Sequence, residues 1–347
     1  MKIIYVILIL SLIWFNYKLS RREFFNNRYE NFSIVPKHFL MESEKLGFKN
    51  EIININPTKI KIYNGKKSCY VSPLSYSFNN NNYKNVILAR NKFKTYNLLR
   101  LNGIPTPNFQ LFQNINKNTA NQILNKKNIN YPIVAKIIDG ANGDNVYVNL
   151  KNDSDLSYSI DRIVNNNFKE LMIEEFISGK DYRILMFDNK IIDVLCRIPP
   201  FVIGNDKDNI KELVYNKNIH RREFGYRPII IDYYYLKKCN FNTEYVPKKN
   251  QKIIVNPLAN FHKGADLQRV NINDIHNDNK NLFIKISKIM NLKIIGIDFI
   301  SKNLNVSYLN QGKVNEVNGI PNLDLHYYAN NEKNTKVFRK ILEIYFK

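Results

Sequence analysis

The sequence predicts an α+β protein built of several subdomains, and three observations support this fold class. Helical and strand-like patterns are mixed along the 347 residues, without the strict strand–helix alternation that a parallel sheet requires. Apolar residues make up 44% of the chain, which is enough for a sizeable core. The sequence also contains no internal repeat. We therefore expect two or three packed layers or subdomains.

The N-terminal segment differs in composition from the rest of the chain. Residues 3–15 (IIYVILILSLIWF) are almost continuously apolar, and Lys18, Arg21 and Arg22 follow them. This apolar run is shorter than the roughly 20 residues that a spanning helix needs. Because more positive charge follows the run than precedes it, we interpret residues 1–30 as an uncleaved membrane anchor with a basic flank. The following domain would then be cytosolic. A cleaved signal and a helix lying on a membrane are the alternatives.

A small α/β subdomain is expected over residues 31–88. The stretch HFLMESEKLGF has a helical pattern, and the strand-like runs EIININ, IKIYNG and SCYVS follow it. The dipeptide Asn64-Gly65 between two β-rich runs predicts a hairpin turn. The run Asn79–Asn82 has low complexity and is expected to be a loop.

Residues 89–347 are expected to form the main domain. A short amphipathic helix follows Lys92 and ends at Gly103, because Pro105 and Pro107 prevent its continuation. The next patterns are, in order, the strand PNFQLF, the helix NTANQILNKKN, the strands YPIVAKII and VYVNL, a helix near 153–167 and the strand ELMIEEFI.

The second half of this domain continues the mixed pattern. The strands RILMFDN and KIIDVLCRI surround a turn expected at Asn189-Lys190. A helix over NLFIKISKIM precedes the strands IIGIDFI and KVNEVN, which are separated by a turn at Gln311-Gly312. A C-terminal helix ends the chain.

Charge and cysteine content restrict the function class. The formal net charge of +22 favours anionic partners such as nucleotides, nucleic acid or lipid headgroups. No compact Lys/Arg block lies outside the N-terminus, so a general use of Lys on the surface is the simpler interpretation. Cys69, Cys196 and Cys239 are far apart and form no CxxC pair, which excludes a disulfide framework and a zinc site and fits a reducing compartment.

The first candidate motif is glycine-containing, in a chain with only 12 glycines. Gly140 and Gly143 lie in KIIDGANGDNV, which starts at Lys136 on an apolar strand. Glycines in a turn let backbone N–H groups approach phosphate oxygens, and a lysine on the preceding strand can neutralise the phosphate charge. A plain hairpin turn is the alternative.

The second candidate motif is a pair of carboxylates, Glu174 and Glu175, at the end of an apolar strand in IEEFISGKDYR. Such a hinge can present backbone groups to an adenine edge, while Asp181 accepts hydrogen bonds from ribose hydroxyls. An ordinary solvated loop is the alternative.

The third candidate motif is a carboxylate within an apolar strand. Asp298 interrupts IIGIDFI, and burial of an unpaired carboxylate is so unfavourable that Asp298 should be paired with a cation or a metal ion. Glu316 and Asn318 are two residues apart and therefore lie on one face of a strand. Three oxygen ligands from neighbouring strands suit Mg²⁺. A buried salt bridge to Lys or Arg is the alternative.

The order of these motifs resembles the ATP-grasp superfamily over roughly residues 38–328. Within it, the chain is similar to the cyanophycin synthetase group, to the ATP-grasp module of bifunctional glutathione synthetases and to glutamate-adding ligases. The blocks that carry the similarity are YPIVAKIIDGANGDNV, IEEFISGKDYRILM, NPLANFHKGAD, GIDFI and EVNGIPNLDLH. The resemblance implies two α+β subdomains that clasp ATP, a lid at about 105–175 and a core at about 176–347, after the small N-terminal subdomain.

The resemblance also implies roles for individual residues. The residues that would bind the nucleotide are Lys92, Lys136, Gly140, Gly143, Val146, Glu174, Glu175, Phe176, Ile177 and Asp181. The residues that would hold two Mg²⁺ ions, for which Mn²⁺ is a substitute, are Asp298, Glu316 and Asn318. Arg183 and Arg197 would face the acyl phosphate or an acidic substrate, and Asn260 and Lys263 belong to a loop that would close on the transferred phosphoryl group.

The implied activity is an ATP- and Mg²⁺-dependent ligase that joins a carboxylate to an amine through an acyl phosphate, with an amino acid or peptide as substrate. Gly264-Ala265 and Pro321-Asn322 stand where the family usually has Gly-Gly and Pro-Gly, which leaves the substrate open. An ATP-grasp kinase and a degenerate, membrane-attached anion-binding protein are the alternatives. No nucleic-acid partner is expected, because aromatic and basic residues do not alternate regularly. The oligomeric state stays open, with a dimer as one option.

Overall fold

The computed structural model describes residues 29–347, except for 74, 117, 139 and 141–142. The predicted membrane segment 3–15 therefore lies outside the described residues. Among the residues that are described, no helix is both long enough and apolar enough to cross a membrane. The chain forms two compact units: the first ends at Ser77 and includes Phe346, and the second spans Phe78–Tyr345 and includes Lys347. The domain boundaries expected from the sequence stay predictions.

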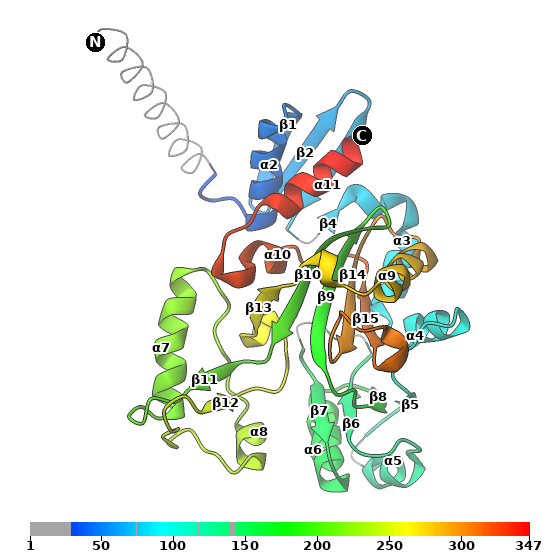
Figure 1. Ribbon diagram of the computed structural model, residues 1–347. Helices are drawn as coiled ribbons and strands as arrows, with labels where there is room; N and C mark the ends of the chain where they lie inside the picture. The colour runs from blue at the N-terminus through cyan, green and yellow to red at the C-terminus, as the bar shows by residue number, and fades with distance from the viewer. Residues whose placement is uncertain (1–28, 74, 117, 139, 141–142) are drawn as a thin grey trace. The chain divides into compact units, whose positions relative to one another are not determined.

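The described residues of the first unit form one helix and one antiparallel sheet (Figure 1). Its elements are α2 (Ile34–Lys45), β1 (Lys49–Ile55), β2 (Thr58–Asn64), β3 (Lys67–Ser72) and β4 (Ser75–Tyr76), and the strand order is β1-β2-β3-β4. Alternate residues of β2 and β3, such as Ile60 and Val71, are buried, as expected for a sheet with one solvated face. Asn64 pairs with Lys67 across Gly65, whose φ is +59°, which confirms the predicted hairpin.

The loop predicted at Asn79–Asn82 is wrong. Residues Ser77–Asn82 form a short 3₁₀-helix, η1, and the side chain of Asn79 is buried. The Asn79 amide nitrogen donates to the carbonyls of Ile294 (2.9 Å) and Gly319 (2.8 Å), and its oxygen accepts from the Ile294 N–H (3.0 Å). A run that looks featureless in sequence thus supplies a buried amide that ties the start of one strand to the end of another.

The second unit contains a four-stranded antiparallel sheet, here called the lid sheet. It has the order β5-β8-β6-β7 and is built from β5 (Phe109–Gln113), β6 (Ile133–Lys136), β7 (Val146–Leu150) and β8 (Glu170–Glu175), with α5 (Ala120–Lys126) and α6 (Asp153–Asn165). Leu156, Ile160 and Ile163 of α6 are spaced by three or four residues and pack on the buried face of the sheet.

The central sheet of this unit has five antiparallel strands in the order β13-β10-β9-β14-β15. The strands are β9 (Lys180–Phe187), β10 (Lys190–Ile198), β13 (Asp266–Arg269), β14 (Ile294–Ser301) and β15 (Lys313–Asn318). The tight turn between β9 and β10 uses Asp188-Asn189, both with positive φ, so the predicted turn is one residue too late.

The two faces of the central sheet differ in chemistry. Tyr182, Ile184 and Met186 alternate along β9 and face an apolar core that the helices α3 (Tyr83–Arg90), α4 (Lys92–Leu101) and α9 (Asn277–Met290) complete. Because successive side chains of a strand point to opposite faces, the intervening Asp181 and Arg183 point away from this core. The second face, here called the polar face, therefore carries these charged side chains at one end of β9 and Leu185 and Phe187 at the other.

The remaining elements include a small body with its own core. It spans residues 202–255, here called the 202–255 segment, with most of β11 (Phe201–Ile203), α7 (Ile210–Glu223), α8 (Tyr233–Lys238) and β12 (Lys252–Ile254). Its core residues are Val202, Ile210, Val214, Ile229, Leu236, Ile253 and Val255. The chain ends with α10 (Asp324–Tyr328) and α11 (Lys336–Phe346), and short 3₁₀ turns are η2 (Phe261–Lys263), η3 (Ile272–Asp274), η4 (Tyr308–Asn310) and η5 (Ala329–Asn331). Mixed helices and antiparallel sheets confirm the α+β fold class.

Candidate active site

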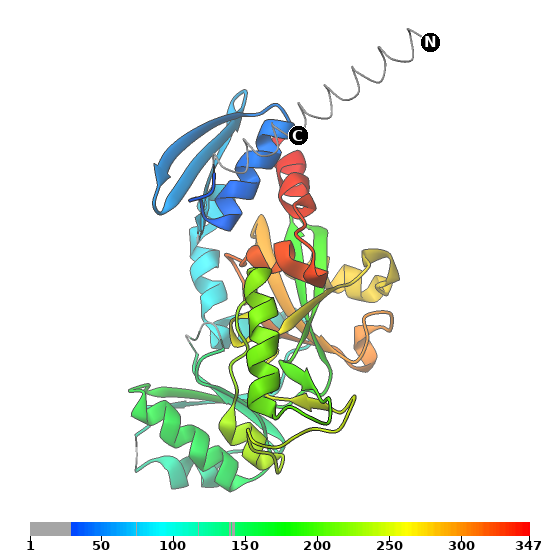
Figure 2. The same ribbon diagram turned by 90° about the vertical axis from the view of Figure 1, so that its left-hand side faces the viewer.

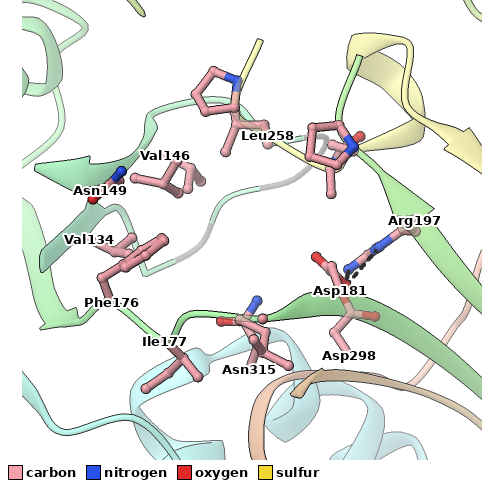
Figure 3. A pocket seen from close by; sticks show the side chains of 18 of the residues that line it. Val134, Val146, Asn149, Phe176, Ile177, Asp181, Arg197, Leu258, Asp298 and Asn315 are labelled. Atoms are coloured by element: carbon pink, nitrogen blue, oxygen red, sulfur yellow. Dashed lines mark hydrogen bonds and ion pairs between the residues drawn. The ribbon is translucent and has the colours of Figure 1, made fainter. Parts of the chain in front are cut away.

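A cavity of about 650 Å³ lies between the lid sheet and the polar face of the central sheet. Figure 3 shows apolar side chains, among them Val134 and Phe176, on one side of it, and Asp181, Arg197 and Asp298 on the other. The site residues predicted from the sequence that line it are Lys92, Lys136, Gly140, Gly143, Val146, Glu174, Glu175, Phe176, Ile177, Asp181, Arg197, Asn260, Asp298 and Glu316. The predicted residues that do not line it are Arg183, Lys263 and Asn318.

Two buried lysines enter the cavity from different elements. Lys136 ends β6, and its ammonium lies 2.7 Å from Glu174 Oε1 on the neighbouring strand β8. Lys92 begins α4, where it donates to the Gly140 carbonyl (3.2 Å) and lies 3.4 Å from Glu316 Oε1. Buried ammonium groups need compensating charge, and each lysine has a carboxylate here. The Glu174 side chain therefore pairs with Lys136, beside the strand end at which an adenine contact was predicted.

Tyr96 connects these charged groups, and the sequence reasoning missed it. Its ring is fully buried on α4, one helical turn after Lys92. The hydroxyl donates to the Asn315 carbonyl (2.5 Å) and lies 3.2 Å from Glu174 Oε2 and 3.4 Å from Lys136 Nζ. Burial and the Glu174 carboxylate raise the pKa of Tyr96 well above its usual value, so the hydroxyl keeps its proton.

The hinge after β8 is held in place by Glu175, the second carboxylate of the pair Glu174 and Glu175. Glu175 accepts from the Asn108 N–H (3.0 Å) and forms an ion pair with Lys313 of β15 (2.6 Å). The backbone N–H of the next residue, Phe176, donates to the Pro132 carbonyl (3.1 Å). These contacts fix the direction in which the chain leaves the strand, so that Phe176 and Ile177 reach the cavity wall.

Asp298 is paired with two arginines, as the buried-carboxylate argument requires. Arg183 Nε lies 2.8 Å from Asp298 Oδ1, and Arg197 Nη2 lies 3.0 Å from Asp298 Oδ2. Arg197 also donates to Asp181 from Nε (3.0 Å) and Nη2 (2.6 Å), so that it bridges the two carboxylates. Gly296 makes room for Arg183, because a Cβ at this position would lie 2.4 Å from Arg183 Nη1.

Burial shapes the titration of this cluster. Burial raises the pKa of the Asp181 carboxyl, and Asp298 adds to the rise, whereas Arg197 opposes it. Burial lowers the pKa of Arg183, and the Asp298 carboxylate opposes that change. Burial also acts against the charge of Arg197, but Asp181 and Asp298 raise the pKa of this arginine overall. The guanidinium groups are thus held as cations by the carboxylates that they contact.

A β-bulge places the remaining carboxylate beside Asp298. Asp298 on β14 is directly opposite Glu316 on β15, but its neighbour Phe299 is opposite Val314, so that Asn315 is an extra residue. Because of this extra residue, Val314 and Val317 both reach the apolar core although they are three residues apart. Glu316 remains at the cavity, and the bulge carbonyl accepts the hydrogen bond from Tyr96 described above.

The chemistry of these side chains fits a divalent metal ion held by two carboxylates and one amide. Directly opposite residues on antiparallel strands have Cβ atoms about 5 Å apart, so the carboxylates of Asp298 and Glu316 can both coordinate one metal ion. Asn318 is opposite Gly296, and its amide nitrogen is buried without a hydrogen-bond partner among the described residues. No cluster of three His, Cys, Asp or Glu side chains suited to a metal occurs in the described part of the chain.

The loop 260–264 meets the glycine turn of the lid sheet. Lys263 Nζ lies 2.5 Å from Asp144 Oδ1, and a Cβ on Gly143 would lie 3.2 Å from the Asn260 amide nitrogen. Gly264 has a φ of +92°, and a Cβ there would lie 2.4 Å from the Ile229 Cα, so that only glycine fits this turn without strain. Lys263 therefore contacts the turn rather than the cavity itself.

The cavity also has a wall that the sequence reasoning did not find. Tyr235 of α8 and Lys252 and Ile254 of β12 line it, all from the 202–255 segment. Their pattern in the sequence is that of ordinary surface and strand residues, so periodicity gives no signal for a role at a site. Only the fold brings them there.

Comparison with known proteins identifies the family. Residues 89–201 and 256–341, more than half of the chain, match the RimK-like ATP-grasp domain. The glutathione biosynthesis bifunctional protein GshAB of Clostridium perfringens is 26% identical, and the match covers 94% of this chain and 43% of that protein. Cyanophycin synthetase of Trichormus variabilis is also 26% identical, over 70% of this chain and 27% of that protein.

A solved structure supports the same fold. The crystal structure of a bifunctional glutathione synthetase from Pasteurella multocida superposes with a TM-score of 0.63 at 22% identity, and covers 92% of this chain and 44% of that one. The chain spans less than half the length of each of these relatives. The resemblance to the ATP-grasp superfamily is confirmed, and the chain belongs to the RimK-like ATP-grasp family.

Proposed function

We propose that this chain is an ATP-dependent carboxylate–amine ligase. A carboxylate oxygen of one substrate attacks the γ-phosphorus of ATP, ADP leaves, and an acyl phosphate forms. The nitrogen of an amine then attacks the acyl carbon, inorganic phosphate leaves with the C–O bond electrons, and the amine loses a proton as the C–N bond forms. Such transfers depend mainly on positioning and charge neutralisation, and little on a protein nucleophile.

One observation carries the proposal: two buried lysines and two acidic side chains line a single cavity. Lys92 and Lys136 are 7% and 4% exposed, yet both line the cavity. Asp298 and Glu316 line the same cavity from the central sheet. A triphosphate needs cations along its length, and a metal ion needs carboxylates near the terminal phosphate. Both requirements are present within one space.

The arginines would act on the transferred group. Arg197 lines the cavity and already spans Asp181 and Asp298, so its guanidinium lies between the proposed ribose contact and the proposed metal ligands. In this position it can neutralise developing charge on the phosphoryl oxygens. Arg183 is buried behind Asp298 and would orient that carboxylate through the 2.8 Å contact.

A magnesium ion, when bound by Asp298, Glu316 and Asn318, would supply additional positive charge to the phosphate oxygens. Asp298 also contacts Arg183 and Arg197, so a bound ion would share this carboxylate with two guanidinium groups. Mn²⁺ is proposed as a substitute ion.

The substrate class proposed is an amino acid or a short peptide. The relatives named above are a glutathione biosynthesis protein and cyanophycin synthetase. Gln268 and Asn260 also line the cavity and provide uncharged polar groups, as required to bind a polar substrate.

The experiment is phosphate release from ATP with pools of amino acids and short peptides, followed by product mass spectrometry. We expect phosphate release that depends on Mg²⁺ and on one of the pools. The product should have the summed mass of its two substrates minus one water. The double variant Asp298→Asn/Glu316→Gln should lose this release, whereas the surface variant Glu343→Gln should keep it. Release that is equal in both variants would refute the proposal. A phosphorylated small molecule as the final product would instead indicate a kinase.

A further inference from the structure

The 202–255 segment is anchored to the rest of the second unit, because Lys217 and Arg221 pair with Asp266 of β13 and the Tyr226 hydroxyl donates to the Tyr328 carbonyl. Its ends pair with each other, with Phe201 opposite Ile254 and Val202 opposite Ile253. Close to these ends, a Cβ on Gly204 would lie 2.2 Å from the Lys248 carbonyl oxygen, so that the two sides of the segment are in close contact there. The segment has its own apolar core, and it is the part of the chain that lies between the two stretches matched by the family. It is therefore a small body with its own core that is held against the central sheet.

This body touches the lid sheet through α6 and α8, which lie near one another in Figure 1. The rings of Tyr158 on α6 and Tyr234 on α8 stack with a centroid distance of 3.8 Å and an interplanar angle of 5°. Lys238 Nζ lies 2.5 Å from Asp155 Oδ2, and the Tyr234 hydroxyl donates to Asp155 Oδ1 (3.2 Å). We call these four residues the clasp.

The clasp has no direct role in lining the cavity, but it joins two of the cavity walls. Tyr235, the residue after Tyr234, lines the cavity from one side, and Val148 and Asn149 of β7 line it from the other. The clasp side chains hold two cavity walls together but do not line the cavity. They are therefore suited to control the opening of the cavity rather than the chemistry within it. Figure 2 shows the same elements from a second direction, again with α8 close to α6.

The contacts are of a strength that suits repeated opening. Asp155 is 5% exposed and also accepts from the Lys151 N–H (2.8 Å), so its position does not depend on the partner body. Lys238 is partly exposed and can be hydrated when the contact breaks. A stacked aromatic pair and one partly exposed ion pair stabilise the contact far less than the apolar packing stabilises either body.

We propose that the clasp fastens the lid sheet, through α6, to the anchored 202–255 segment, and that the clasp must open for nucleotide to enter and leave the cavity. This inference rests on the nucleotide binding, though not on the ligase chemistry, of the proposed function. The glycine turn and the loop 260–264 form a second contact between the same two walls, through Lys263 and Asp144. Two sets of contacts therefore border the cavity, the clasp and the Lys263–Asp144 ion pair. Only the clasp involves the 202–255 segment, which lies outside the family match.

The test compares two double variants on the same helix. Tyr234→Ala/Lys238→Ala removes the clasp from α8, whereas Tyr233→Ala/Lys237→Ala removes the same atoms from side chains that are exposed and do not contact α6 in the contacts described above. Dissociation of a fluorescent ATP analogue is followed by stopped flow with Mg²⁺ present. We expect the clasp variant to release the analogue about tenfold faster, which corresponds to about 1.4 kcal/mol, and the control variant to match the wild type.

Two results would overturn the proposal: dissociation from the clasp variant at the wild-type rate, or equal acceleration in both variants, which would indicate general loosening of α8. If the wild-type chain binds no nucleotide, the proposed function fails, and amide hydrogen exchange then decides on the clasp. Exchange within 153–165 and 233–238 should be faster in the clasp variant than in the control. Equal exchange in the two variants would show that the clasp holds nothing together.

Discussion

Replacement of Arg197 by leucine should destabilise the second unit in a way that depends on pH. The substitution removes both contacts to Asp181 (3.0 and 2.6 Å) and the one to Asp298 (3.0 Å). Removal of one partner from a buried ion pair costs about 3–5 kcal/mol. Because Asp298 keeps Arg183 and the Asp181 side chain is 22% exposed, we expect the lower end, about 3 kcal/mol at neutral pH.

The pH dependence follows from the sign of the pKa change. Burial already raises the pKa of Asp181 in the wild type, and loss of the opposing guanidinium raises it further. A carboxylate whose pKa is higher in the folded than in the unfolded state lowers stability at pH above both values. This penalty begins to shrink as the pH falls to the folded pKa, and it is gone below the unfolded pKa. The difference between variant and wild type should therefore be largest at neutral pH and shrink toward acid.

The assay is urea unfolding followed by circular dichroism at a series of pH values between neutral and mildly acidic. Arg339→Leu is the control, because its partner Glu343 is on the surface and the pair is 46% and 41% exposed. That variant should lose less than about 1 kcal/mol. A loss for Arg197→Leu that is as small as the control, or that does not change with pH, would refute the assignment of Arg197 as the bridge between the two carboxylates.

Three further outcomes are expected. Gly296→Ala should displace Arg183, whose Nη1 would lie 2.4 Å from the new Cβ, and should lower the unfolding free energy by about 1–3 kcal/mol in the same urea assay. Asn79→Ala should lower the melting temperature, because it leaves buried backbone groups at the start of β14 without partners, at about 1–3 kcal/mol per group; an unchanged melting temperature would contradict the buried clamp. Burial alone would raise the pKa of Asp155, but the hydrogen bonds from the Lys151 amide and Lys238 bring it below its usual value. The stability from this carboxylate is therefore present above the unfolded pKa and is lost only as the pH falls through the folded pKa, so the nucleotide dissociation rate should be constant around neutrality and rise in acid.

Features were predictable from the sequence where the residue type alone requires a particular partner, such as a cation beside a buried carboxylate. Asp298 in an apolar strand required a cationic partner, and the structure supplies Arg183 and Arg197. The helix after Lys92 was also predictable, and its buried positions 92, 95, 96 and 99 form one stripe. A lysine on such a stripe is a signal for a functional cation, because an ordinary lysine would not be placed on the core side.

Other features depend on contacts between residues far apart in the sequence, which local patterns do not reveal. Asn79 was interpreted as part of a loop because its neighbours are all asparagine, yet its amide binds backbone groups more than 200 residues away. In the sequence, Tyr96 has the pattern of a core aromatic residue. The partner of its hydroxyl, the Asn315 carbonyl in the β-bulge, is visible only in the structure. The 202–255 segment contains ordinary amphipathic patterns, so its position beside the cavity follows only from the path of the chain.

The extra residue at Asn315 has a consequence for how this chain can vary. With Asn315 present, Val314 and Val317 both fill the core and Glu316 stays at the cavity. Deletion of one residue between Val314 and Val317 would restore a regular strand. Either Val314 would then point away from the core, or Glu316 would point away from the cavity. Substitutions at this edge of the sheet are therefore easier to accommodate than changes in length. Among homologous chains, insertions and deletions should avoid the stretch 313–318, and an alignment of many such sequences would show whether they do.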